Sequence, residues 1–239
     1  MKLDLVAFAS HPDDAELGCS GTLIAHAQAG YKVGIVDLTR GELGTRGTPE
    51  ERRQEAEQAS KVIGLQVRRN LGLADGFFTN DRDHQLAVIR VIRELQPEVV
   101  LANAFDDRHP DHGKGSKLVS DACFMAGLRK IESANSLGQA QQPWRPKAVY
   151  HFIQDRFIQP DFVVDISAQW EQKLQAIKAF RSQFYDPENA APNTYISSPD
   201  FLKFVEARAR EYGHAIGTTF GEGFSKERHL GVRDLFTLI

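Results

Sequence analysis

Short apolar runs rich in β-branched residues alternate with longer stretches of helical spacing along the first half of the chain. The apolar runs cover residues 3–9, 33–38 and 97–102, and the helical stretches cover 17–29, 49–63 and 85–95. Strands that alternate with helices predict βαβ units and a parallel sheet. Near-continuous apolar strands indicate burial on both faces. We therefore predict an α/β fold, a Rossmann-like and mostly parallel sheet with helices on both faces.

The second half is less regular. Its pattern predicts helices at 111–130, 170–184 and 201–212, strands at 148–153 and 161–166, and loops at 133–146 and 186–199. The loops are too short to be domain linkers, and no internal repeat is evident. A chain of 239 residues can bury a full core without disulfides or a structural metal. We predict a single domain over residues 1–239, with its functional site at the carboxyl ends of the strands.

Composition excludes several classes of partner. The net charge is −3 and no run of Lys and Arg occurs, which argues against nucleic acid. Cys19 and Cys123 lie far apart without a CxxC motif, so neither a disulfide framework nor a cysteine-rich zinc site is indicated. No segment has the length of a signal peptide or a membrane span. We predict a cytoplasmic protein that acts on a small molecule.

An imidazole and two adjacent carboxylates follow the first predicted strand, as His11, Asp13 and Asp14. Functional crevices of open α/β sheets lie beyond the carboxyl ends of the strands. Neighbouring ionised aspartates repel each other, and a bound cation relieves that cost. Because an Asp before a helix is also an ordinary N-cap, capping is the alternative interpretation. We favour the metal site.

A second polar cluster follows the predicted strand at 97–102. It packs two histidines and three aspartates into seven residues: Asp106, Asp107, His109, Asp111 and His112. Two such clusters from separate strands can converge on one ion. Histidine and carboxylate ligands with an open position are typical of catalytic zinc. A carboxylate that is not a ligand can then act as general base, and a histidine can stabilise an oxyanion. Spacing alone does not decide which residue takes which role.

These clusters resemble the signatures of a known family. The segment from His11 to Glu16 resembles the AHPDDxE motif of the LmbE-like (PIG-L) zinc N-deacetylases, and residues 109–112 resemble their HPDH motif. Ser10 is a departure, because the family usually has Ala directly before the histidine. Similarity in 41–48, 207–213 and 221–224 extends the resemblance over essentially the whole chain. Those segments look like the branch that deacetylates N-acetylglucosaminyl malate in bacillithiol biosynthesis.

The resemblance implies a role for each polar residue of the two motifs. One Zn²⁺ per chain would be held by His11, Asp14 and His112, although iron or cobalt could occupy the same set. Asp13 would be the general base and then the acid. His109 would stabilise the oxyanion, and Asp111 would hold His109 in its cationic form. Related enzymes are often homo-oligomers, and the apolar stretch at 230–239 could join such an interface.

The resemblance also suggests substrate-binding residues. Arg52 and Arg108 match positions that face the sugar conjugate, and Asp75 matches one that binds sugar hydroxyls. An arginine fork suits the two carboxylates of malate. Arg46, in the glycine-rich loop, is a further candidate. For the arginines the alternative is a solvated charge, and for Asp75 an ordinary turn residue.

Several residues and functions stay open at this point. Glu16 could cap or buttress the first helix, and His214 and Glu222 could line the pocket. The rival functions are a metallo-deacetylase of another N-acetyl sugar, such as a chitooligosaccharide, and a non-catalytic Rossmann-type protein that binds a sugar or nucleotide. Fold alone does not separate them.

Overall fold

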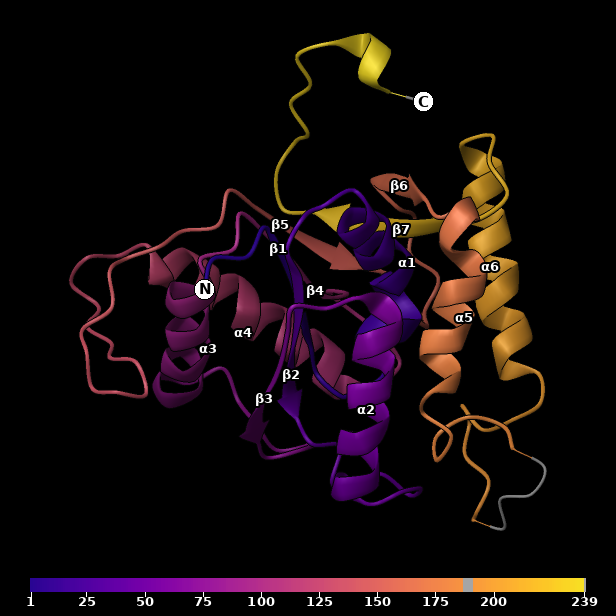
Figure 1. Cartoon of the computed structure of the whole chain (residues 1–239), viewed down its shortest axis with the longest axis horizontal. Coiled ribbons are helices and arrows are strands. Elements are labelled where there is room, and N and C mark those ends of the chain that lie inside the picture. The colour runs from indigo at the N-terminus through magenta and orange to yellow at the C-terminus, as the bar shows by residue number, and fades with distance from the viewer. Residues whose placement is uncertain (187–190, 239) are drawn as a thin grey trace.

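The computed structural model describes residues 1–186 and 191–238 and is built on one seven-stranded sheet (Figure 1). The strands are β1 (Leu5–Ala9), β2 (Val33–Thr39), β3 (Val67–Leu73), β4 (Val99–Asn103), β5 (Ala148–Phe152), β6 (Phe162–Asp165) and β7 (Gly221–Lys226). Their order is β3-β2-β1-β4-β5-β7-β6. The first five strands of that order run parallel, and β7 is antiparallel to both its neighbours. The predicted α/β class is confirmed.

Helices cover both faces of the sheet. They are α1 (Asp14–Gln28), α2 (Pro49–Ile63), α3 (Arg82–Leu95), α4 (Pro110–Ala126), α5 (Trp170–Lys178) and α6 (Phe201–Ala215), with 3-10 turns at Ser167–Gln169 and Leu235–Thr237. Helices α3 and α4 lie on one side of the sheet, and α1, α2 and α5 lie on the other (Figure 1). Within the described residues, none of these helices is long and apolar enough to cross a bilayer.

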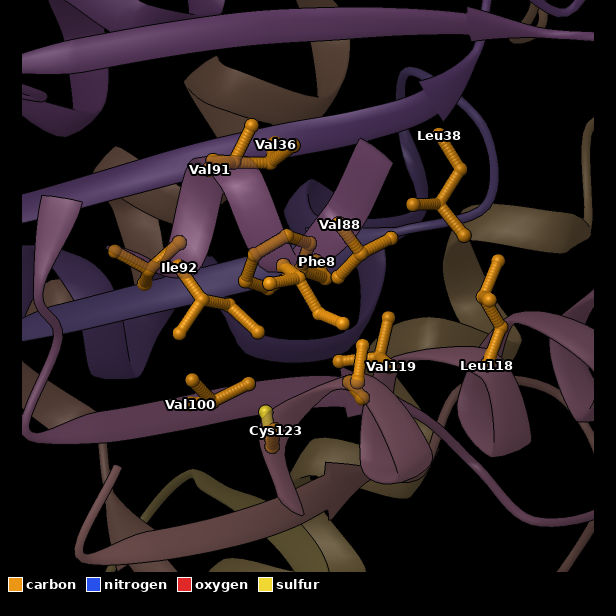
Figure 2. Close-up of a cluster of buried hydrophobic side chains, with 14 of the residues drawn as sticks. Phe8, Val36, Leu38, Val88, Val91, Ile92, Val100, Leu118, Val119 and Cys123 are labelled. Atoms are coloured by element: carbon orange, nitrogen blue, oxygen red, sulfur yellow. The ribbon is translucent and has the colours of Figure 1, made fainter. Parts of the chain in front are cut away.

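Alternation along β1 divides the core in two. Phe8 packs with residues of α3 and α4, among them Val88 and Val119 (Figure 2). Ala7 points to the other side and packs with Leu23 of α1. Successive side chains of a strand face opposite sides of the sheet, so a strand between two helical layers must be apolar throughout. This requirement explains the continuous apolar runs of the sequence.

Helix α2 occupies the predicted residues because its sequence carries both end signals. Thr48 and Glu51 form a capping box, Pro49 takes the first helical position, and Gly64 ends the helix with φ 83°. A left-handed residue at this position favours glycine. Other bounds differ: α4 ends at Ala126 rather than 130, and the predicted helix at 170–184 ends at Lys178.

Two strands were missed because neither has a strand-like composition. Strand β3 reads VRRNLGL and lies at the sheet edge, where polar side chains are tolerated. Strand β7 reads GEGFSK, and glycine disfavours strands. Close packing requires those glycines: a Cβ on Gly223 would lie 2.7 Å from the ring of Tyr212. Tertiary contacts therefore decide what local propensity does not.

The order of the strands fixes where a site can form. The chain passes from β1 outward to β2 and β3, and then returns to place β4 on the other side of β1. Loops that leave β1 and β4 in opposite directions open a crevice between them. Both polar clusters of the sequence, at 11–16 and 106–112, lie in these two loops and in the first turns of α1 and α4 that follow them.

Candidate active site

Asp13 stands in an unusual backbone conformation where β1 gives way to α1. Its φ is 110° and its ψ −25°, a region that L residues other than glycine rarely adopt. The carboxylate turns to Arg52, whose Nη2 donates to Asp13 Oδ2 at 3.0 Å, rather than to the helix amides. The capping interpretation is therefore wrong for this residue. Strain of this kind costs about 1–3 kcal/mol and is concentrated at functional sites.

The environment of Asp13 suits a proton carrier. Burial raises the pKa of its carboxyl to about 7, against the opposing charge of Arg52. A carboxyl that titrates near neutrality can both accept and return a proton. Arg52 is itself buried and also donates to the carbonyls of Pro12 and Gly41.

Two imidazoles converge on Asp14, directly after the strained residue. Its Oδ1 lies 3.1 Å from His112 Nε2, and its Oδ2 lies 3.5 Å from His11 Nδ1. All three residues are buried. Asn103 Nδ2 and Gln154 Nε2 donate to the same carboxylate at 3.2 and 2.8 Å. Strand ends and the first turn of α1 thus place one carboxylate between two ring nitrogens.

Outer carboxylates fix the orientation of both rings. Asp107 Oδ2 accepts from His112 Nδ1 at 2.8 Å, which leaves Nε2 facing Asp14. Asp75 Oδ1 accepts from His11 Nε2 at 3.0 Å, which leaves Nδ1 facing Asp14. A histidine that donates its second nitrogen to a carboxylate is the usual arrangement around a bound metal. The donor chemistry of His11, Asp14 and His112 therefore fits zinc.

Charge in this cluster favours a cation. Burial alone would lower the pKa of His112, but the charge of Asp14 and the hydrogen bond to Asp107 raise it to about 9. Burial also opposes protonation of His11, yet hydrogen bonds to Asp111, Asp14 and Asp75 hold its pKa well above the usual value. Carboxylates that draw protons onto both imidazoles would also attract a divalent ion.

Two other sets of donors share His11. Ligand atoms of His11, His109 and His112 lie within 4.8 Å of one another, as do those of His11, Asp75 and Asp111. In these sets Asp75 is already the partner of the second nitrogen of His11. His109 accepts a backbone hydrogen bond at Nδ1. In the set of His11, Asp14 and His112, each imidazole has a separate carboxylate as the partner of its second nitrogen: Asp75 for His11 and Asp107 for His112.

His109 is the N-cap residue of α4. Its Nδ1 accepts from the amide of Asp111 at 3.3 Å, so the remaining nitrogen, Nε2, carries the hydrogen. Burial lowers the pKa of His109, and the charges of His11 and His112 lower it further. The Asp111 carboxylate contacts the Gly76 amide at 2.7 Å and Lys114 Nζ at 3.0 Å. His109 is thus prepared to donate as a neutral imidazole.

A cavity of about 210 Å³ opens above these groups. Its walls include Leu17, Leu43, Gly44, Asp75, Gly76, Arg108, Gln154, Gln183 and Ile196, in addition to Asp13, Asp14, Arg52 and the three histidines. Arg108 is 44% exposed, and its guanidinium lies 4.4 Å from the ring centroid of Tyr195. Arg108 lines the cavity at its exposed rim, and we call it, together with the Tyr195 ring stacked on it, the mouth of the cavity.

The other expected substrate residues take different places. Arg52 lines the cavity, as expected of a residue that faces the substrate, and its guanidinium also holds the Asp13 carboxylate. Arg46 is buried outside the cavity wall and donates to the carbonyl of Ser182 at 2.8 Å. Asp75 does line the cavity, but its carboxylate also accepts from the Leu43 amide at 2.9 Å and from His11.

The open residues of the sequence also have positions. Glu16 is buried and accepts from Arg68 at 2.6 Å, which makes it a buttress of α1. His214 is exposed on α6 and away from the cavity. Sequence reasoning missed Asn103 and Gln154, although both directly follow or end predicted strands, as site residues in parallel sheets do.

Known proteins resemble this chain in sequence and in fold. Residues 6–123 match the family model described as GlcNAc-PI de-N-acetylase, PIG-L. The conserved protein TT1542 of Thermus thermophilus superposes with a TM-score of 0.85 at 38% identity, over 97% of this chain and 98% of that one.

Two curated relatives add information on chemistry. Diacetylchitobiose deacetylase of Thermococcus kodakarensis is 27% identical over 89% of this chain and 79% of its own length. The 4-oxalmesaconate hydratase of Pseudomonas putida is 26% identical over 73% of this chain and 71% of its own length. The scaffold therefore occurs in both a deacetylase and a hydratase.

Proposed function

This chain belongs to the PIG-L family of de-N-acetylases, and we propose that it is a zinc-dependent hydrolase that removes the N-acetyl group from an N-acetylglucosamine conjugate. The observation that carries the proposal is the placement of Asp13. This buried carboxyl, with a pKa near 7, stands beside the donors His11, Asp14 and His112. A sugar-binding module has no use for a strained base next to a metal site.

The residues divide the work of amide hydrolysis. Zinc, when bound by His11, Asp14 and His112, would polarise the amide carbonyl and lower the pKa of water. Asp13 takes a proton from the attacking water and returns it to the leaving amine. His109 donates its Nε2 hydrogen to the oxygen that gains negative charge. Arg52 holds the Asp13 carboxylate in place through the 3.0 Å contact.

We propose an anionic conjugate, N-acetylglucosaminyl malate, as the substrate. Arg108 supports this choice because its guanidinium is at the cavity mouth, where the group attached to the sugar would lie. The nearest Asp155 carboxylate oxygen lies 3.5 Å from Arg108 Nε, too far for a tight pair. A malate carboxylate could therefore compete for the arginine fork.

A neutral chitooligosaccharide is the second candidate. Similarity to the diacetylchitobiose deacetylase favours it, as does the half-exposed Tyr195 ring beside Arg108, whose apolar surface suits contact with a second sugar. In this alternative Arg108 stiffens the tyrosine through the stacked contact rather than pairing with the substrate.

Amine release separates these functions. The assay compares N-acetylglucosaminyl malate, diacetylchitobiose and free N-acetylglucosamine, with and without a chelator and added zinc. Chelator-sensitive turnover with the highest kcat/KM for the malate conjugate is the expected result. A preference for diacetylchitobiose would transfer the assignment to the second candidate. A hydratase would release no amine from any of the three, and this outcome would overturn the proposal.

We also propose that copies of the chain associate. Large apolar side chains of the C-terminal segment 230–238 are exposed, with Phe236 at 96% and Leu235 at 74%. Exposed apolar groups gathered in one segment mark interaction surfaces. Light scattering should give an oligomer for the full chain and a smaller particle after removal of residues 230–239. A monomeric full chain would contradict this proposal.

A further inference from the structure

Helix α1 has backbone groups that bond to side chains from other elements. Glu222 of β7 accepts from the Gly21 amide at 2.9 Å and from the Thr22 amide at 2.7 Å. Lys173 of α5 donates to the Leu17 carbonyl at 2.7 Å and to Glu222 Oε1 at 2.5 Å. One buried ion pair therefore contacts three main-chain groups of the helix, the Leu17 carbonyl and the Gly21 and Thr22 amides.

Two of the contacted groups, the Leu17 carbonyl and the Gly21 amide, are the acceptor and the donor of one helical hydrogen bond. In an α-helix the amide of residue 21 pairs with the carbonyl of residue 17. Here the Leu17 carbonyl has Lys173 as a partner, and the Gly21 amide has Glu222. The ion pair thus forms a bridge that runs beside the helical bond and joins its two ends. Side chains inserted at the helical ladder are a known cause of local bending.

Close packing makes this bridge possible. A Cβ on Gly18 would lie 2.2 Å from the Phe152 ring, and a Cβ on Gly21 would lie 2.8 Å from Ile166. The glycines let α1 approach the sheet closely enough for a β7 side chain to reach its main chain. Glu222 and Lys173 are 4% and 2% exposed, so the ion pair is shielded from water.

Stability alone is a poor explanation for such a pair. Removing two charges from water offsets much of their attraction, and replacement by apolar residues is often neutral or stabilising. What an apolar pair cannot supply is a fixed partner for each backbone group. The turn that ends at Leu17 begins with Asp14, and Leu17 itself lines the cavity. The bridge is therefore anchored directly behind the candidate metal site.

We propose that Lys173 and Glu222 are positioning residues that set the first turn of α1 and hold Asp14 at the distance and angle the metal requires. This inference rests on the proposed function, because it assumes that Asp14 is a zinc ligand. It assigns to β7 and α5, elements remote from both sequence motifs, a defined role in metal affinity.

Zinc affinity and stability together test the proposal. The variants are Lys173→Met, Glu222→Leu and the double variant, each measured for zinc dissociation constant by competition with a chromophoric chelator and for Tm of the metal-free protein. Each single variant leaves an unpaired buried charge, so we expect Tm to fall by roughly 10 °C. The double variant removes both charges and should recover most of that loss. Its zinc dissociation constant should nevertheless stay about 10–100-fold above wild type.

A double variant with both Tm and zinc affinity restored would overturn the proposal, because the pair would then serve packing only. If the double variant fails to fold, Glu222→Gln provides a second comparison, since it keeps the volume and removes the charge. A raised zinc dissociation constant in that variant supports positioning, and an unchanged one overturns it.

A control is the partly exposed ion pair of Arg69 and Glu94, which joins β3 to α3 away from α1 with contacts of 2.6 and 2.7 Å. The variant Arg69→Met/Glu94→Leu should leave zinc affinity unchanged. All these measurements are made without substrate. A failure of the deacetylase assignment would appear in the amine-release assay, whereas a failure of the positioning role appears in the zinc titrations.

Discussion

The floor and the mouth of the cavity are built in different ways. On the floor, Asp13, Asp14 and His112 are buried, and each has a hydrogen bond to a further residue, to Arg52, Asn103 and Asp107 respectively. At the mouth, Arg108 and Tyr195 are 44% and 50% exposed and hold each other mainly by stacking. We infer from this comparison that the hydrogen-bonded residues of the floor carry out the reaction, whereas the exposed side chains of the mouth select the substrate.

Removal of the base should have the largest effect on the floor. Asp13→Asn keeps the shape of the side chain and leaves the ligand set, but it cannot carry a proton. We expect kcat to fall about 10²–10⁴-fold while zinc stoichiometry stays at one per chain. Steady-state kinetics and metal analysis check both parts.

Asp106→Asn is the control for this variant, because Asp106 belongs to the second motif cluster but is 74% exposed and pairs with Arg156. Its kcat should match wild type. Near-normal turnover by Asp13→Asn would exclude Asp13 as the general base. The claim that the floor residues carry out the reaction would then fail as well.

Loss of the oxyanion donor should come next. His109→Ala removes the Nε2 hydrogen that the backbone contact from Asp111 directs away from the helix. We expect kcat to fall about 10²–10³-fold, with little change in zinc affinity. His214→Ala, at an exposed position of α6, serves as the control. A loss of zinc in His109→Ala would instead assign this residue to the ligand set with His11 and His112.

The floor was largely predictable from sequence, and the mouth was not. His11, Asp14 and His112 lie within two short motifs at strand ends, and the topology of a parallel sheet brings such ends together. Arg52 and Arg46 show the limit of this reasoning. Both have the charge that a substrate would need, but Arg52 lies at the cavity wall bound to Asp13, and Arg46 lies outside the wall bound to Ser182. Motif spacing does not report which partner a long side chain selects.

The fold shows the same division. Strands with apolar runs were predicted, because burial on two faces leaves a compositional signal. Strand β7 has no such compositional signal. Its Gly223 allows the Tyr212 ring to pack closely, and its Glu222 accepts a hydrogen bond from the main chain of α1. Local sequence patterns do not report contacts between residues 200 positions apart, and such contacts explain why this segment forms a strand.

An intermediate effect is expected behind the floor, at Asp107, whose role the motifs alone did not identify. Asp107→Asn weakens the hydrogen bond that orients His112 and leaves the ring in the cluster. We expect zinc affinity to fall about 10–100-fold. Chelator competition measures it, with Asp106→Asn again as the control. Unchanged affinity would mean that packing orients His112. The hydrogen bonds of the floor would then matter less for metal binding than we propose.

The smallest effect is expected at the mouth. Arg108→Ala removes a half-exposed guanidinium whose contacts with Asp155 and Tyr195 leave the floor untouched. Exposed charge pairs contribute at most about 1 kcal/mol, so KM for the malate conjugate should rise by at most about 5-fold at low salt, with kcat unchanged. Because salt screens exposed charges, the difference between variant and wild type should shrink as ionic strength rises. KM for diacetylchitobiose, which carries no charge, should change little.

Arg210→Ala is the matched control, since Arg210 also stacks on a ring, that of Phe220 at 4.5 Å, and pairs with Glu206 outside the cavity. If kcat fell in Arg108→Ala as it does in Asp13→Asn, the mouth would take part in the reaction itself, and the separation between a fixed floor and an adaptable mouth would fail.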